Sequence, residues 1–196
     1  MNQNNLAKYI ADHTHTDENE LETLLSHCST MQVKKGEFLL REGEKCMHSF
    51  FVENGLLRQY YLDDSGKEYI VQFAPENWFM SDRESVYFDL PTHYFIQALE
   101  DTSVFLFDES LIMHLSTTNS KFLEFNNRLL HNHIRHLQRR ITLLMSATAE
   151  QRYLEFIQIY PDLINRVSQI SIASYLGITP ESLSRVRKEI LSKHQK

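Results

Sequence analysis

The side chains best suited to specific recognition of another molecule lie in a short C-terminal segment, between residues 168 and 188. Arg185 can donate hydrogen bonds to both O6 and N7 of a guanine, and Glu181 can accept one from N4 of a cytosine or orient the arginine. An ordinary surface ion pair is the alternative explanation of the same spacing. If the segment enters a major groove, the side chains left for recognition are Thr179, Glu181, Ser182, Arg185, Arg187 and Lys188, and those placed for phosphate contacts are Ser168, Gln169 and Ser171.

Two short helices joined by a tight turn must position these side chains, and residues 169–188 have the pattern of a helix-turn-helix. Ala173 is small where the two helices would cross, and Gly177 stands where the turn needs a left-handed backbone. Thr179 can cap the second helix, and Pro180 suits its first turn. The small core is expected to contain Ile172, Leu176, Ile178, Leu183 and Val186. This pattern predicts a DNA-binding motif, and a helical hairpin without that activity is the alternative.

Charge is distributed unevenly along the chain. Residues 1–110 contain 8 Lys and Arg against 20 Asp and Glu, a net charge of −12, whereas residues 111–196 contain 12 against 6, a net charge of +6. The basic part suggests a nucleic acid or an acidic membrane as partner, although a solvated helical surface explains a modest excess too. Because the whole chain carries −6, any contact with DNA should be local and specific.

Residues 111–146 contain no Gly or Pro, which predicts one long helix of about 54 Å. Apolar residues repeat along it at heptad spacing, as in helices that pack against a second copy. The predicted homodimer interface consists of Leu123, Leu130, Ile134, Leu137, Ile141 and Leu144. Burial of this stripe against a sheet of the same chain is the alternative.

Residues 31–107 contain short β-rich runs separated by turn signals such as Asn54-Gly55. Strands are predicted at 37–40, 49–52, 56–62, 68–73, 94–99 and 104–107, which indicates an antiparallel barrel or jelly roll. Residues 1–30 predict short helices, with Thr16-Asp17 as a cap. The aromatic residues of the β-rich segment suit either a barrel core or an apolar ligand pocket; they are Tyr60, Tyr61, Trp78, Phe79 and Tyr87.

The composition, 42% hydrophobic and 23% charged, is that of a folded protein. No run approaches 18 apolar residues, so no membrane span is predicted. Two cysteines, Cys28 and Cys46, and no segment resembling a signal peptide favour the reducing cytoplasm. No nucleophile elbow, HExxH or P-loop occurs, so no enzyme is predicted.

A β-roll, a long helix and a C-terminal helix-turn-helix, in this order, resemble the Crp/Fnr family of bacterial transcription regulators. Residues 35–43, 51–58 and 64–68 look like the glycine-bearing turns of that family's cyclic-nucleotide-binding β-roll. The resemblance implies an α+β fold in three parts: an antiparallel β-roll (jelly roll) with flanking helices at 1–110, a long dimerisation helix at 111–146, and a winged-helix-like helix-turn-helix with a truncated wing at 147–196. It also implies that a ligand in the β-roll shifts a dimer between DNA-binding states.

Two departures from the family pattern alter this expectation. The family's phosphate-binding cassette has a Gly-Glu pair and a later Arg-Ser or Arg-Thr pair, where this chain has Ser81-Asp82 and Thr92-His93. Without that arginine, cyclic AMP is not expected to bind, although Arg83 or His93 can replace it in part. Residues 188–196 leave no room for the strand pair of a wing, and Pro180 stands where the family often has a basic residue. The candidate pocket for an unknown effector comprises Ser81, Asp82, Arg83, Thr92 and His93.

Metal cofactors are not predicted. The iron-sulfur cluster of the oxygen-sensing branch needs four cysteines, and the chain has two. A metal-sensor role is suggested by five histidines, but the 131/133 spacing points two of them apart, and polar positions beside a heptad stripe are the simpler explanation. These histidines are His13, His15, His131, His133 and His136.

The sequence therefore predicts a cytoplasmic, homodimeric regulator that binds double-stranded DNA and acts with RNA polymerase, with no membrane partner and an effector of unknown identity. A small-ligand receptor module that works through protein contacts, with a degenerate helix-turn-helix, is the alternative suggested by the missing wing and Pro180.

Overall fold

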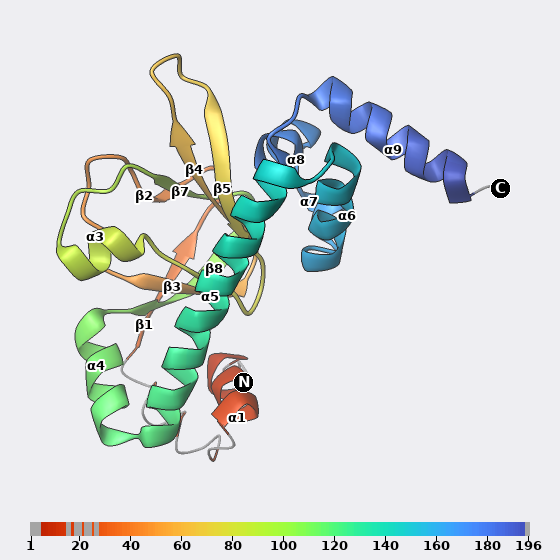
Figure 1. Ribbon diagram of the computed structural model, residues 1–196. Helices are drawn as coiled ribbons and strands as arrows, with labels where there is room; N and C mark the ends of the chain where they lie inside the picture. Colours follow the sequence, from red (N-terminus) through yellow and green to blue (C-terminus); the bar gives the residue numbers. More distant parts are fainter. Residues whose placement is uncertain (1–4, 15–16, 18–20, 22–24, 26–27, 195–196) are drawn as a thin grey trace. The chain divides into compact units, whose positions relative to one another are not determined.

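The computed structural model describes residues 5–14, 17, 21, 25 and 28–194. These residues fold into two compact units (Figure 1). One unit contains Met1–Tyr61 and Gln72–His131, and the other contains Leu62–Val71 and Asn132–Lys196. Each unit has its own set of buried residues and is described separately.

Two four-stranded sheets built from antiparallel pairs form the β-roll. The first has the order β1-β8-β3-β6, with β1 at Ser29–Val33, β8 at Thr102–Phe107, β3 at Ser49–Asn54 and β6 at Phe79–Met80. The second has the order β2-β7-β4-β5, with β2 at Phe38–Leu40, β7 at Phe95–Ala98, β4 at Leu57–Leu62 and β5 at Glu68–Ala74. The predicted jelly roll is confirmed, and β1 and β6 are additional strands that the sequence pattern did not indicate.

The β-roll encloses an apolar core because alternate side chains of each strand point inward. Val52 and Val104, for example, face each other across β3 and β8 and are fully buried. The core also contains Val33, Leu40, Cys46, Phe50, Leu57, Ala74, Met80, Ile96 and Ala98.

A second cluster of this unit joins β-roll residues to helices. Helix α1 (Asn5–Thr14), helix α4 (Glu109–Thr118) and the start of helix α5 (Ser120–Ser146) contribute to it (Figure 1). Its buried side chains include Leu6, Ile10, Phe51, Phe105, Phe107, Leu115, Phe122 and Phe125. The predicted N-terminal helix is confirmed in α1, whereas the Thr16-Asp17 cap falls mainly outside the described residues. The unit thus extends past residue 110 into α5.

The helix predicted over 111–146 is interrupted, so the prediction of one continuous helix is wrong. Asn119 has an extended backbone (φ −131°, ψ 107°) between α4 and α5. Its side-chain oxygen accepts a hydrogen bond from the N–H of Phe122 at 3.0 Å, so the asparagine caps the start of α5. Asparagine favours caps because its side chain competes with the backbone for hydrogen bonds.

The second unit contains the later part of α5 and helices α6 (Ala149–Ile159), α7 (Leu163–Arg166), α8 (Gln169–Leu176) and α9 (Pro180–His194). Thr148 and Gln151 form a reciprocal capping box at the start of α6. Three aromatic rings, of Phe156, Tyr160 and Tyr175, pack together with centroids 5.4 to 5.8 Å apart. These rings fix α6 against α8.

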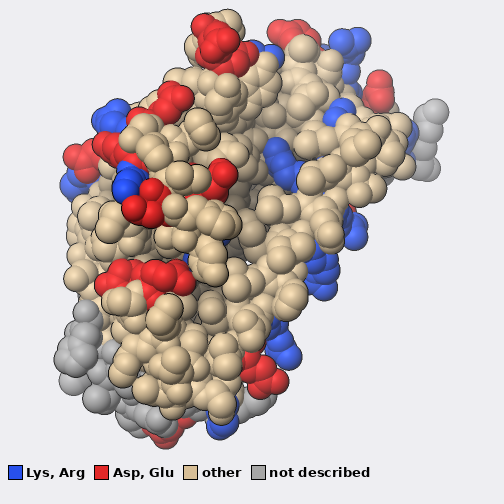
Figure 2. All heavy atoms as spheres, turned by 60° about the vertical axis from the view of Figure 1, so that its left-hand side comes forward, with Lys and Arg blue, Asp and Glu red and all other residues tan. Residues whose placement is uncertain are grey.

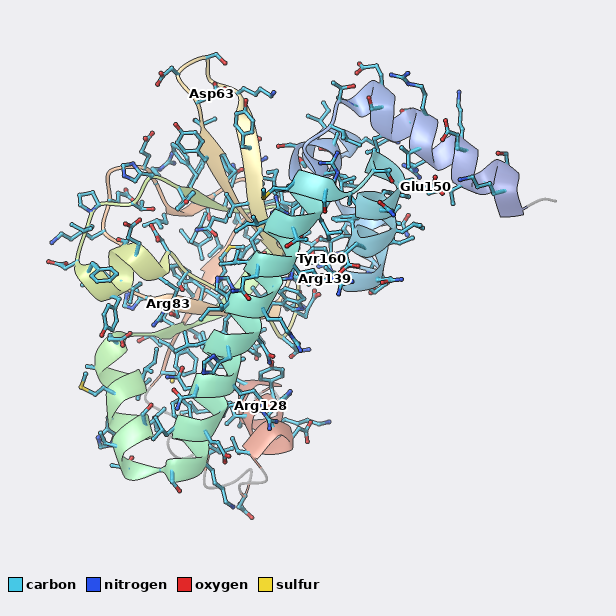
Figure 3. All side chains as sticks on the ribbon, in the orientation of Figure 1. Asp63, Arg83, Arg128, Arg139, Glu150 and Tyr160 are labelled. Atoms are coloured by element: carbon cyan, nitrogen blue, oxygen red, sulfur yellow. The ribbon has the colours of Figure 1, made fainter. Side chains whose placement is uncertain are left out.

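The tip of the β4–β5 hairpin belongs to the second unit and is hydrogen-bonded to α8. The N–H of Ile70 donates to the Ser174 hydroxyl oxygen at 3.0 Å, and that hydroxyl donates to the carbonyl of Glu68 at 2.9 Å. At the turn, the carboxylate of Asp63 (Figure 3) accepts hydrogen bonds from Ser65 and Lys67. The Ser65 hydroxyl is the main cause that lowers the Asp63 pKa to about 2.

Candidate nucleic-acid interface

The turn of the predicted helix-turn-helix has the geometry that its glycine requires. Gly177 has a left-handed backbone (φ 65°, ψ 38°), and its N–H donates to carbonyls at the end of α8. A Cβ at this position would lie 3.2 Å from Cδ2 of Leu144. Glycine is thus favoured at position 177 both by backbone conformation and by space.

At the start of α8, the Ser168 hydroxyl accepts a hydrogen bond from the N–H of Ser171 at 3.1 Å.

Helix α9 begins with the cap that its sequence indicated. The hydroxyl oxygen of Thr179 accepts a hydrogen bond from the N–H of Ser182 at 3.3 Å, and Pro180 occupies the first position of the helix. The pKa of Glu181 is lowered chiefly by its own backbone N–H, then by the Thr179 hydroxyl, with a smaller contribution from Arg185. Glu181 and Arg185 therefore attract each other, as their spacing predicts.

The predicted core of the motif is buried almost entirely. Ile172, Ala173, Leu176 and Leu183 are at most 2% exposed, and Val186 is 8% exposed. Ile178 is only half-buried. Phe156 of α6 and Tyr160 just after it contact the Tyr175 ring and add to this core, a contribution that the motif's own pattern does not include. The Lys193 ammonium also contacts the Glu150 carboxylate of α6 at 2.7 Å.

The side chains proposed to contact DNA remain on the surface. Thr179, Glu181, Arg185, Lys188, Ser168 and Gln169 are exposed, whereas Ser182, Arg187 and Ser171 are half-buried. The hydroxyls of Ser168, Ser171, Thr179 and Ser182 are engaged in caps. Helix α9 has four Lys and Arg against two Glu, a local excess of positive charge. On the face drawn in Figure 2, Asp and Glu form several clusters, as expected from the acidity of residues 1–110.

The heptad stripe of α5 stays largely open to solvent. Leu123, Ile134, Ile141 and Leu144 are 42%, 49%, 56% and 42% exposed, and Leu130 and Leu137 are half-buried. Phe122 and Phe125, by contrast, are buried in the first unit's core. Leu123, Ile134 and Ile141 therefore lie apart from the side of α5 that packs in the first unit's core, whereas Leu144 also packs near Gly177.

Two of the residues predicted to form an effector pocket in the β-roll, Asp82 and Thr92, bond to each other. Asp82 is 5% exposed, caps helix α3 (Arg83–Phe88) through the N–H groups of Glu84 and Ser85, and accepts from the Thr92 hydroxyl at 2.6 Å. Arg83 lies 3.9 Å from the Glu109 carboxylate, and His93 is exposed. Ser81 is half-buried beside this cap. A carboxylate thus occupies the helix N-terminus that an incoming phosphate would need.

The described residues meet neither the requirements of a metal site nor those of a membrane-spanning helix. No three His, Cys, Asp or Glu side chains gather there with the geometry of a metal site; His15 lies outside the described part of the chain. No described helix is both long and apolar enough to span a membrane.

Comparison with known proteins places this architecture in a class. Residues 30–119 match the family model described as cyclic nucleotide-binding domain. Transcriptional activator protein Anr of Pseudomonas aeruginosa is 29% identical over 167 residues, which cover 79% of this chain and 67% of that protein. FixK2 from Bradyrhizobium japonicum superposes with a TM-score of 0.73 at 21% identity, covering 85% of this chain and 86% of that one. A CooA mutant from Carboxydothermus hydrogenoformans superposes with a TM-score of 0.73 at 18% identity, covering 98% of this chain and 86% of that one.

These findings define a protein with a cyclic-nucleotide-binding-type β-roll and a C-terminal helix-turn-helix. In sequence the chain is similar to transcriptional activators such as Anr, and in fold it is similar to FixK2 and CooA.

Proposed function

We propose that the protein is a sequence-specific DNA-binding transcription regulator that reads the major groove with α9. The observation that carries this proposal is a complete helix-turn-helix: most of its core is buried, Thr179 caps α9, and Glu181 and Arg185 of α9 lie at the surface. A recognition helix needs this combination, because the core fixes its position and the exposed side chains contact base edges. The similarity of the chain to transcriptional activators such as Anr supports the same function.

The regulator works as a homodimer joined through the exposed stripe of α5. A two-fold dimer presents two copies of α9, so its site is an inverted repeat with half-sites about 34 Å apart. The dimer acts in the cytoplasm and meets RNA polymerase at the promoter. These statements rest on the exposed stripe and on the similarity to Crp/Fnr regulators.

Cyclic AMP is not its effector. The Asp82 carboxylate already receives the N–H groups at the start of α3 and the Thr92 hydroxyl, all of which could otherwise serve a phosphate. A cyclic phosphate placed there would face a buried negative charge without a bidentate arginine.

The test is enrichment of bound duplexes from a random library by the wild-type protein, Arg185→Ala and a control, Arg128→Ala. Arg128 is an exposed arginine of α5, remote in sequence from the motif (Figure 3). An inverted repeat is expected for the wild type and the control. Loss of the contact from Arg185 should weaken binding by about 1 to 3 kcal/mol, roughly 5- to 150-fold. Equal enrichment by Arg185→Ala would contradict recognition through α9, and no enriched motif with the wild type would favour a receptor module that acts through protein contacts.

A further inference from the structure

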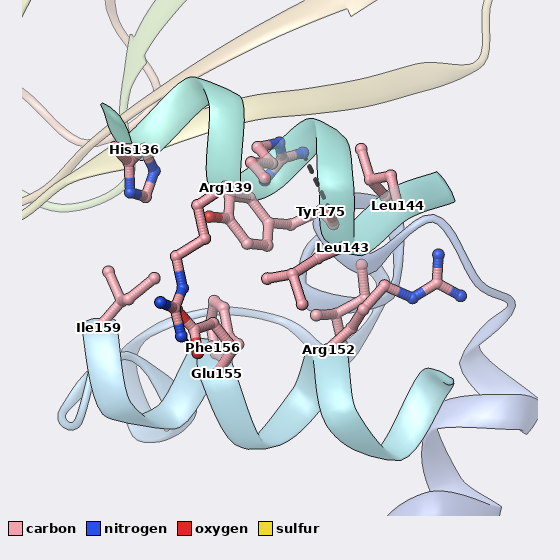
Figure 4. Close-up of a pocket in the computed structure, with 11 residues that line it drawn as sticks. His136, Arg139, Leu143, Leu144, Arg152, Glu155, Phe156, Ile159 and Tyr175 are labelled. Atoms are coloured by element: carbon pink, nitrogen blue, oxygen red, sulfur yellow. Dashed lines mark hydrogen bonds and ion pairs between the residues drawn. The ribbon is translucent and has the colours of Figure 1, made fainter. Parts of the chain in front are cut away.

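The second unit contains a hollow that the DNA-binding motif does not use. Its cavity volume is about 30 Å³, it is partly open to solvent, and it lies between α5, α6 and α8 (Figure 4). Leu143, Phe156 and Tyr175 line its apolar part, and Leu144, Ile159 and Leu176 add to it. The polar lining is almost entirely basic, with His136, Arg139, Arg140 and Arg152 against the single acid Glu155.

Arg140 is held firmly in this lining but has a donor to spare. Its Nη2 donates to the carbonyl of Ile70 at 2.9 Å and to that of Tyr175 at 3.0 Å, and its guanidinium carbon lies 3.7 Å from the centre of the Tyr175 ring. Its Nη1 is buried and has no acceptor. A guanidinium that is fixed in place with an unused N–H is preorganised to bind an anion.

A second donor of the lining is also without an acceptor. Nε of Arg152 is buried and unpaired. Arg139, in contrast, forms a two-pronged ion pair with Glu155, with Nη2 and Oε2 at 2.8 Å, and this pair spans from α5 to α6 (Figure 4). Glu155 therefore neutralises Arg139, and in the part of the chain that the structure describes neither Arg140 nor Arg152 forms an ion pair with a carboxylate. Buried unpaired donors are rare in folded proteins, which makes two in one hollow informative.

We propose that this hollow binds a small organic anion, a carboxylate with an apolar body. The carboxylate would accept from Nη1 of Arg140, and the apolar body would pack against Leu143, Phe156 and Tyr175. A fully hydrated anion such as phosphate lacks the apolar surface that this lining can cover.

Binding of an anion in this hollow and protonation of His136 should each strengthen the other. The pKa of His136 is lowered by burial, and then by Arg140 and His133, with Glu155 opposing them. Arg139 and Arg152 are the other charged groups of the lining, and Tyr175 faces it from α8. A carboxylate nearby would stabilise the imidazolium, so anion binding should take up a proton and become tighter as pH falls from 8 to 6.

A ligand bound in this hollow would also contact a residue that supports the DNA-binding motif. Arg140 joins the β5 carbonyl of Ile70 to the last turn of α8 through Tyr175, so a ligand on Nη1 would hold α8 more firmly. An effect on DNA affinity rests on the proposed function, whereas binding of the anion does not.

The test is calorimetric titration of the full chain, without DNA, with three probes: benzoate, its neutral relative benzyl alcohol, and inorganic phosphate. Saturable binding of benzoate with a Kd near or below about 1 mM, and no binding of the other two, is expected. Arg140→Met should weaken benzoate binding at least about tenfold, and Arg128→Met, an exposed arginine of the same helix, should leave it unchanged.

Because Arg140 also supports backbone carbonyls, a second variant keeps the test independent of stability. Leu143→Phe fills part of the hollow without removing a hydrogen bond, and it should also abolish benzoate binding in a protein whose thermal unfolding is unchanged. Absence of benzoate binding to the wild type, equal binding of phosphate, or full binding by Leu143→Phe would each overturn the proposal. If the protein binds benzoate but enriches no DNA motif, anion binding in the hollow is supported and the proposed DNA-binding function is rejected.

Discussion

Replacement of Ile134 by glutamate should dissociate the dimer proposed to form through α5. Ile134 is 49% exposed, so about half of its apolar surface is left for an interface to bury. Full burial of an isoleucine side chain stabilises by about 1.5 to 3 kcal/mol, which gives roughly 1 kcal/mol for each copy and roughly 2 for the pair. In the Ile134→Glu dimer, two facing carboxylates would also lose water, which destabilises the dimer by about a further 1 kcal/mol or more. A total near 3 kcal/mol corresponds to a Kd raised about 100-fold.

Sedimentation equilibrium over a range of concentrations measures this Kd directly. Asn132→Glu is the matched control, because it adds the same charge to an exposed position of the same helix, two residues away from Ile134 and outside the stripe. The control should stay dimeric where Ile134→Glu is monomeric. If both variants keep the wild-type Kd, or if the wild type is a monomer at micromolar concentration, the assignment of the stripe as an interface is refuted.

Three further predictions concern the stability and reactivity of single sites. Ser174→Ala removes both hydrogen bonds to the β4–β5 hairpin, so it should lower the free energy of unfolding by about 1 to 3 kcal/mol and speed amide exchange at Ile70; unchanged exchange would contradict the role of Ser174. Gly177→Ala should lower the free energy of unfolding by about 1 to 2 kcal/mol in denaturant titrations, because the backbone is left-handed at φ 65°. An unchanged denaturation midpoint would show that alanine is not strained at this position. Burial, with help from Asp108, raises the pKa of Cys28 to about 11, so its alkylation should be slow at pH 8 and accelerate toward pH 11; the rate of a free thiol at pH 8 would show that the thiol is not buried.

The helix-turn-helix was predictable because its determinants are local. A small residue at Ala173, a glycine at Gly177 and a cap at Thr179 each act within a few residues, and the structure has each in the expected conformation. The β-roll was predictable for a similar reason, since glycine turns and alternating apolar residues mark its strands.

Features that depend on distant residues were not predictable. Ser174 looks like an ordinary surface residue of α8, yet it bonds to strand residues more than 100 positions earlier. The role of Asp82 as a cap that accepts from Thr92 depends on the fold bringing the two together. The anion-binding hollow requires α5, α6 and α8 to meet, and no spacing in the sequence marks it.

Asn119 is a different case, because its signal is local but weak. The stretch from 111 to 146 has no Gly or Pro, and helical spacing continues through it. One asparagine is enough to end α4 and start α5, since its side chain bonds to the N–H of Phe122. Caps by asparagine are common, but the residue also occurs inside helices, so the sequence alone favours the unbroken helix.

The most direct test of the central proposal is a fluorescence-anisotropy titration of the wild-type protein with the enriched duplex and with a shuffled duplex of the same composition, at several salt concentrations. A regulator that reads bases through α9 should bind the enriched duplex at least about 10³-fold more tightly, with affinity for both falling steeply as salt rises. Equal affinity for the two duplexes, or binding insensitive to salt, would contradict sequence-specific recognition of DNA by this protein.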